Sequence, residues 1–172
     1  MGTDDRVMLR RLGEGESIEA VCKDAGMARG EFDRWWSDQL EARLPDPRGS
    51  RTLDGVGSVE IFRDELGTPH VYADNDDDLF YGYGYTTGQD RLWQLDYLRR
   101  KSMGTLSEVL GPSGIELDTI ARTVGINRIA VEEADRLPDL TVRRLKAFAR
   151  GINGAMEEAR GRLPIEFDLL DY

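Results

Sequence analysis

The chain has 172 residues, of which 33% are charged and 40% are apolar, and its formal net charge is −10. This length suits one domain, or one domain with an appendage, and the composition is typical of a globular protein. The acidic excess would repel phosphate backbones and anionic membrane surfaces, so we expect the chain to bind neither nucleic acid nor a membrane. One cysteine, Cys22, excludes an internal disulfide, and its apolar neighbours predict a buried thiol.

The sequence contains no stretch that approaches the roughly 20 apolar residues of a membrane-spanning helix. The first residues, MGTDDRVMLRR, have no apolar run behind their arginines, which is unlike a secretory signal. We therefore expect a cytoplasmic protein, with the mature form of a periplasmic or secreted protein as the alternative.

Residues 1–44 predict a small helical unit. Ser17 is placed to cap a second helix after the GEGES break, and Gly26 to end it. A third helix follows, in which Phe32 and Leu40, with a tryptophan between them, recur at helical spacing. A helix, a short turn and another helix, with one helix upstream, have the outline of a helix-turn-helix.

The helix-turn-helix outline makes a DNA-binding or regulatory module the alternative function for residues 1–44. The charge argues against it, because residues 1–50 carry 8 basic and 11 acidic side chains. A recognition helix of that sign would be repelled by phosphates. We therefore favour an appendage for packing or for interaction with a protein.

Residues 45–55 predict a linker, because PDPRGSR is rich in proline, glycine and serine. The pattern then changes, and Val59, Ile61 and Arg63 alternate as in a short strand. Turn residues and a second extended run around Pro69 follow, which together predict a β-hairpin.

The acidic run DNDDD, residues 74–78, offers several N-caps for a following helix, and its charge favours the positive end of that helix. A calcium loop fits poorly, because Leu79 and Tyr85 stand where an EF-hand needs Gly and Glu. Farther along, TLSEVLG predicts a short helix, and PDLTVRRLKAFARGINGAMEEARGRL predicts a long one.

The stretch FYGYGYTTGQDR, residues 80–91, carries three glycines. Their spacing, GxGxxxG, fits neither a dinucleotide-binding loop nor a P-loop, and the aspartates just before them would repel phosphate. In a helix, Gly84 and Gly88 lie four residues apart on one face and would let another backbone approach closely.

This face, flanked by Tyr83, is the predicted structural site, a packing seam, and we expect the helix to pack there against the sheet. Glycine costs a helix about 1 kcal/mol, so several glycines are tolerated only where close packing compensates for them. Asp90 and Arg91 follow the seam, and burying either one unpaired would be costly, so we expect each to anchor the helix through a buried pair.

The segment RDELGTPHVYADNDDDLFYGYGYTTGQDRLWQLDYLRRKSMGTLSEVLG resembles the start of the α-subunit of the penicillin acylase family. Gly88 stands where that family usually has alanine. The later FARGINGAMEEARGRLPIEF resembles a helix of the same family and the residues that follow it. The resemblance covers roughly residues 56–172, whereas residues 1–50 have no counterpart in it.

The resemblance implies an α+β fold: this chain and a β-subunit would together form the four-layer αββα sandwich of an N-terminal-nucleophile hydrolase. The two subunits of this heterodimer would arise by autoproteolysis of one precursor. The nucleophile would be a serine at the start of the β-subunit, so we expect no catalytic residue in this chain. The substrate would be an N-acyl amide: a β-lactam side chain, an acyl-homoserine lactone, an N-acyl amino acid or an aryl amide. A catalytically inactive relative is a further alternative.

A chain with one histidine, His70, has no sequence pattern for a Ser-His-Asp triad, and we expect His70 to be structural or hydrogen-bonding. One His and one Cys also do not make a metal site. We expect no cofactor in this chain. The resemblance allows one exception, a structural calcium ion with its ligands mostly outside the chain.

Overall fold

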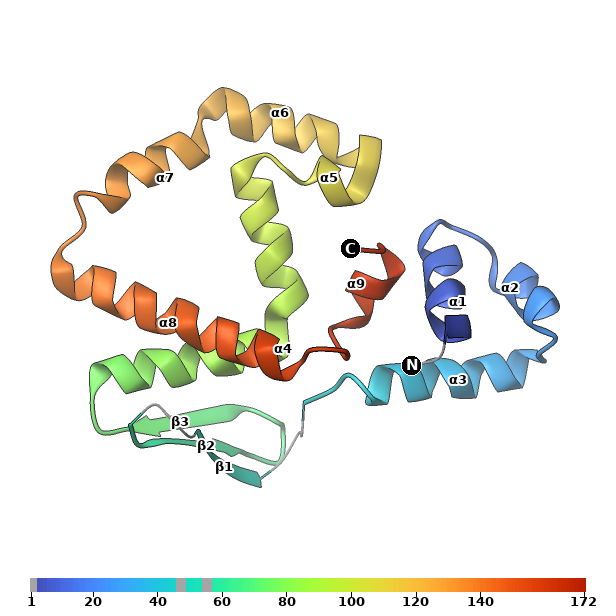
Figure 1. Ribbon diagram of the computed structural model, residues 1–172, viewed down its shortest axis with the longest axis horizontal. Coiled ribbons are helices and arrows are strands. Elements are labelled where there is room, and N and C mark those ends of the chain that lie inside the picture. Colours follow the sequence, from blue (N-terminus) through green and yellow to red (C-terminus); the bar gives the residue numbers. More distant parts are fainter. Residues whose placement is uncertain (1–2, 46–48, 54–56) are drawn as a thin grey trace. The chain divides into compact units, whose positions relative to one another are not determined.

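The computed structural model describes residues 3–45, 49–53 and 57–172 (Figure 1). The chain divides into two compact units. The terminal unit comprises Met1–Leu44 together with Gly161–Tyr172, and the sheet–helix unit comprises Pro45–Arg160. Residues 161–172, which were predicted to belong with the segment from residue 56 onward, thus group with the N-terminal helices.

The terminal unit consists of helices whose bounds are α1 Thr3–Gly13, α2 Ile18–Ala25, α3 Arg29–Glu41 and α9 Ile165–Leu169. Ser17 caps α2, since its side chain accepts a hydrogen bond from the Ala20 amide at 3.2 Å, and Gly26 ends that helix at φ 66°. Val21, Cys22 and Phe32 form the core of the unit with neighbouring apolar side chains. The predicted helices, caps and buried thiol are confirmed.

The sheet–helix unit begins with an antiparallel sheet of order β1-β2-β3, with bounds β1 Gly49–Leu53, β2 Val59–Arg63 and β3 Pro69–Ala73. The β2–β3 hairpin pairs Val59 with Ala73 and Arg63 with Pro69, and alternate residues of β2 are buried, as predicted. β1 pairs along the other edge of β2, within the segment predicted as a linker. An isolated extended segment leaves its backbone groups unpaired, and the exposed edge of β2 supplies partners for them.

The helices of this unit are α4 Asp76–Met103, α5 Ser107–Leu110, α6 Ile115–Val124, α7 Ile126–Ala134 and α8 Asp139–Glu158, with the 3₁₀ helix η1 at Gly111–Gly114. Asn75 caps α4, because its side chain accepts a hydrogen bond from the Asp78 amide at 3.0 Å. α4 is kinked at Arg91, where φ is −138° and ψ is 20°.

Figure 1 shows the first half of α4 running between the sheet and α8, while its second half turns away toward α5 and α6. A small sheet covered on one face by helices is an α+β arrangement, as predicted. No helix within the described part of the chain is long and apolar enough to cross a membrane.

Candidate functional site: the contact between α4 and α8

The glycines of α4 lie where its backbone meets that of α8. A Cβ atom at Gly84 would overlap the carbonyl oxygen of Phe148 and lie 2.8 Å from its carbonyl carbon. One at Gly88 would lie 2.9 Å from the Ala155 Cβ and 3.2 Å from the Ile152 Cα. Both positions therefore need glycine for the two helices to approach this closely.

Small residues on α8 face this contact in turn. A Cβ at Gly151 would overlap the Tyr81 carbonyl oxygen and lie 2.6 Å from the Tyr85 amide nitrogen. Ala147 and Ala155, four residues to either side of Gly151, are 1% and 4% exposed. The sequence reasoning missed this stripe, although its four-residue spacing in a predicted helix was the signal that could have revealed it.

The remaining glycine of the FYGYGYTTGQDR stretch faces the sheet instead. A Cβ at Gly82 would lie 2.6 Å from the Val71 Cγ1 and 2.8 Å from the Val59 Cγ1. Gly82 thus makes the expected contact with the sheet, whereas Gly84 and Gly88 face α8 and not the sheet. Tyr83 lies at the margin: its side chain is exposed, and its ring centroid is 5.1 Å from that of Phe148.

Asp90 joins α4 to the end of β2. Its two carboxylate oxygens accept hydrogen bonds from Arg63 at 2.9 and 3.1 Å, and the Arg63 side chain is only 8% exposed. Arg63 also donates to the Gln89 side-chain oxygen at 3.0 Å and to the Gly67 carbonyl at 2.9 Å. One guanidinium therefore holds the hairpin turn and α4 together, and Asp90 has the charged partner that we expected.

Arg91 differs from the expectation. It is exposed, and its guanidinium donates to the side-chain oxygen of Gln94 at 3.2 Å, one turn along the same helix. The kink at Arg91 separates the half of α4 that packs against α8 from the half that turns away, so this side chain meets solvent and not the seam. The buried pair expected for it does not form.

A second polar cluster closes the far end of the contact. Tyr85, which is 2% exposed, donates its hydroxyl hydrogen to Glu158. Both oxygens of Glu158 accept from Arg51 of β1, at 2.7 and 2.8 Å, and the Arg51 guanidinium lies 5.3 Å from the Tyr85 ring centroid. Burial, and then the bond to Glu158, raise the pKa of Tyr85 well above its ordinary value, so this hydroxyl is a structural donor and not a base.

His70 lies in the hairpin, as predicted, and takes a hydrogen-bonding role. Its Nε2 is 3.2 Å from Oδ2 of Asp64, whose other oxygen accepts from the Leu66 and Thr68 amides at 2.9 Å each. The Thr68 amide first, and then His70, hold the pKa of Asp64 below its usual range. The imidazole thus belongs to a turn that fixes the hairpin.

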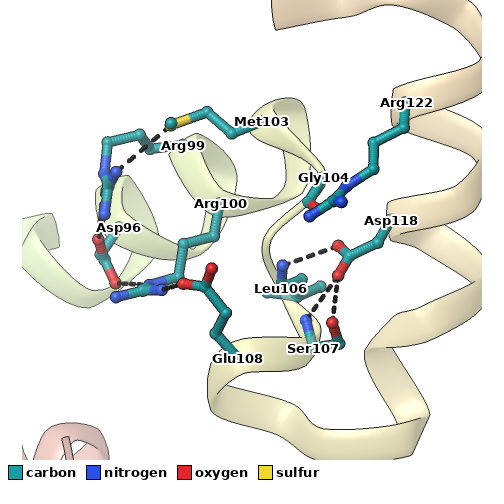
Figure 2. A network of polar contacts seen from close by, with 10 residues as sticks. All are labelled: Asp96, Arg99, Arg100, Met103, Gly104, Leu106, Ser107, Glu108, Asp118 and Arg122. Atoms are coloured by element: carbon teal, nitrogen blue, oxygen red, sulfur yellow. Dashed lines mark hydrogen bonds and ion pairs between the residues drawn. The ribbon is translucent and has the colours of Figure 1, made fainter.

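Asp118 of α6 anchors the segment after α4 (Figure 2). This carboxylate is 5% exposed and accepts hydrogen bonds from the Leu106 amide at 2.7 Å, the Ser107 amide at 2.9 Å and the Ser107 hydroxyl at 2.5 Å. Arg122, one turn farther along α6, donates to the Gly104 carbonyl at 2.6 Å. The turn that ends α4 is therefore held from two points on α6.

The C-terminal half of α4 carries its own charge cluster, drawn beside the first in Figure 2. Asp96 accepts from Arg99 at 2.6 Å and from Arg100 at 2.7 Å, and Arg100 also donates to Glu108 of α5 at 3.0 Å. These contacts tie α4 to α5, so the TLSEVLG segment is fixed from both neighbouring helices.

Replacing Asp118 with Asn should speed amide hydrogen exchange at Leu106 and Ser107 by roughly tenfold or more, because one acceptor oxygen becomes a donor facing other donors. Burial alone would raise the pKa of Asp118, but the hydrogen bonds from Ser107 and Leu106 outweigh it and lower the pKa. The protection should therefore be complete above the ordinary aspartate pKa and disappear as the pH falls through the lower folded value.

The matched control for this change is Glu116→Gln, which removes an exposed carboxylate from the same helix. Exchange measured by mass spectrometry at near-neutral pH and in acid would decide the matter. Equal protection of both amides in the Asp118 and Glu116 variants would contradict the anchoring role of Asp118.

Within the described residues, no three His, Cys, Asp or Glu side chains are grouped so that they could hold a metal ion. A calcium ion ligated mostly outside this chain stays a prediction. At the α4–α8 contact, Asp90 is bound by Arg63 and the Tyr85 hydroxyl by Glu158.

The comparisons with known proteins agree with this architecture. A family model described as penicillin amidase matches residues 58–172. Among solved structures, the thermostable penicillin G acylase from Alcaligenes faecalis superposes with a TM-score of 0.62 and 36% identity, over 68% of this chain and 64% of that chain. The chain belongs to the penicillin amidase family, and the resemblance seen in its sequence is confirmed.

Three curated relatives illustrate the range of the similarity. The penicillin acylase 2 proenzyme of Pseudomonas sp. strain SE83 is 32% identical over 77% of this chain. Penicillin G acylase of Escherichia coli is 36% identical over 66% of it, and the acyl-homoserine lactone acylase QuiP of Pseudomonas aeruginosa is 30% identical over 80%. The matched region makes up only 17%, 14% and 16% of these relatives, respectively.

Proposed function

We propose that this chain is the α-subunit, or the N-terminal part of the α-subunit, of an amide hydrolase that removes the acyl group from an N-acyl amide. Membership of the family supports this, as do relatives named penicillin acylases and acyl-homoserine lactone acylases. The candidate substrates are β-lactam side chains, acyl-homoserine lactones, N-acyl amino acids and aryl amides.

The chain's own role in this proposal is that of a scaffold. The observation that carries it is the glycine-lined contact of α4 with α8, in which Gly84 and Gly151 bring two backbones together. The flanking groups are bound into the fold: Asp90 by Arg63, and Tyr85 by Glu158. A contact that holds Asp90 and Tyr85 in this way positions other elements of the fold.

The reacting groups would come from a β-subunit. Its N-terminal serine, freed by autoproteolysis of a common precursor, would attack the amide carbonyl, and the serine's own α-amino group would accept the proton. Donors in the same subunit would stabilise the oxyanion, and the two subunits together would complete the four-layer αββα sandwich.

Exposed aliphatic side chains on α6 and α7 support a partner of this kind. Those more than 40% exposed on these two helices include Ile115, Ile120, Val124, Ile126, Ile129 and Val131. Large exposed apolar side chains gathered on neighbouring helices are typical of an interaction surface. A second, longer polypeptide that covers both helices would remove it from water.

Isolation of the native protein through a tag on this chain tests the proposal. Mass spectrometry should find a second polypeptide, about twice as long or more, that begins with Ser, Thr or Cys, the residues able to act as N-terminal nucleophiles. Recovery of this chain with no such companion, in a preparation that still hydrolyses amides, would contradict the proposed division of labour.

A further inference from the structure

The terminal unit brings together two stretches that lie at opposite ends of the chain. Residues 3–44 precede the part matched by the family model, whereas residues 161–172 are the last part of that match. Within the unit, α9 packs against α1. α9 spans only Ile165–Leu169, and an isolated helix of that length is not stable in water. Its order must therefore come from the helices that it contacts.

The contact of α9 with α1 is close enough to involve both backbones. Gly13 is the last residue of α1, and a Cβ atom there would overlap the carbonyl oxygen of Leu169 and lie 2.6 Å from its carbonyl carbon. Any other residue at position 13 would push the two segments apart. Glycine at position 13 therefore allows the Leu169 backbone to lie directly against the end of α1.

Charge complementarity surrounds the same contact. Asp168 accepts from Arg43 at 2.7 Å, with the two side chains 14% and 7% exposed, and Arg6 of α1 lies 3.7 Å away. Arg10, also of α1, is 3.6 Å from Asp171. Three arginines of the N-terminal helical stretch therefore face two aspartates of the C-terminal segment.

We propose that residues 3–44 form a docking unit whose occupant is segment 161–172 of the same chain. The helix-turn-helix outline serves here to hold a peptide and not a nucleic acid: its arginines pair with aspartates, and its glycine admits a backbone. The unit fixes the final residues of the family-matched part, a role that does not depend on the proposed hydrolase activity.

Amide hydrogen exchange on the purified 172-residue chain tests this docking. The Leu170 and Tyr172 amides donate to Glu166 and Phe167 carbonyls at 3.0 and 3.2 Å, and they should be protected only while the segment is docked. Gly13→Ala should lower the protection of these amides by about tenfold or more, because the new methyl group displaces Leu169. Intrinsic helix propensity alone predicts the opposite sign, because alanine favours α1.

The matched control is Gly30→Ala in α3, where a Cβ would meet nothing within 4 Å. It should leave exchange in residues 165–172 unchanged. Asp168→Asn provides a second variant that leaves the residues of α1 unchanged, with Asp38→Asn as its control, because Asp38 is an exposed carboxylate of α3. Loss of protection with Asp168→Asn but not with Asp38→Asn would support the docking even if Gly13→Ala unfolded the whole unit.

Two results would overturn the proposal. One is amide exchange at Leu170 and Tyr172 that shows no docking: exchange in the wild type as fast as in a free peptide, or exchange that is equally slow in the Gly13, Asp168 and control variants. The other is a molecular mass of two chains in light scattering, with protection that disappears on dilution, since the segment would then be held by a second copy.

Discussion

Replacing Gly84 by alanine is expected to lower the free energy of unfolding of the sheet–helix unit by about 3 kcal/mol, the upper part of the usual range for overpacking a core. A Cβ at this position would overlap the Phe148 carbonyl oxygen. The atoms nearest to this Cβ all belong to the Phe148 backbone, so the strain is relieved only if the two helices move apart. Leucine should prevent the unit from folding and should therefore also block the assembly and self-processing that we propose.

The sign of the Gly84 effect makes it diagnostic. Alanine is better than glycine in a helix interior by about 1 kcal/mol, so propensity alone predicts a more stable protein. Gly30→Ala, in the open position of α3, should show that small gain. Gly151→Ala, on the facing side of the contact, should destabilise like Gly84→Ala. Urea unfolding followed by circular dichroism would measure the free energy of unfolding of all three variants, and amide exchange would assign each change to one of the two units. A Gly84→Ala chain as stable as the wild type would contradict the close packing.

Replacing Arg63 by methionine is expected to cost about 3 kcal/mol of unfolding free energy, because it leaves the partly buried carboxylate of a broken pair without its cation. Asp90 is 30% exposed and would lose the bonds at 2.9 and 3.1 Å that it accepts from Arg63. The Gly67 carbonyl and the Gln89 side chain would lose the same donor.

A pair of comparisons isolates this effect. Arg99→Met removes an arginine that is 54% exposed in its pair with Asp96, and exposed pairs contribute about 1 kcal/mol or less. Arg63→Met combined with Asp90→Leu should recover part of the lost stability, since removing both charges leaves none buried without a partner. Urea unfolding gives the three values. Equal losses for Arg63→Met and Arg99→Met would show that the Arg63 pair is no stronger than a surface pair.

Local chemistry made much of this fold predictable. Ser17 and Gly26 mark the ends of α2 because caps act within a few residues, and β2 shows its burial in the alternation of Val59, Ile61 and Arg63. The four-residue spacing of Gly84 and Gly88 predicted the close approach of another backbone, although the backbone that approaches belongs to α8 and not to the sheet. Each of these signals lies within a single element.

What the sequence did not reveal depends on partners distant in the chain. β1 has no strong alternation of apolar and polar residues, and it forms a strand by pairing with β2. The bond from Tyr85 to Glu158 joins residues 73 positions apart. Arg91 was expected to be buried because it follows the glycine face, but the kink of α4 at that residue cannot be read from helical spacing. Grouping of α9 with α1 likewise depends on the Gly13 contact.

The measurement that tests the central claim most directly compares amide hydrolysis by two preparations: this 172-residue chain purified by itself, and the native protein isolated through it. With a chromogenic aryl amide as the probe, activity should be found only in the native preparation, which would contain the proposed longer polypeptide with the nucleophile. Turnover of the probe by the folded, purified chain, at a rate comparable to that of the native protein, would contradict the view that it is a scaffold.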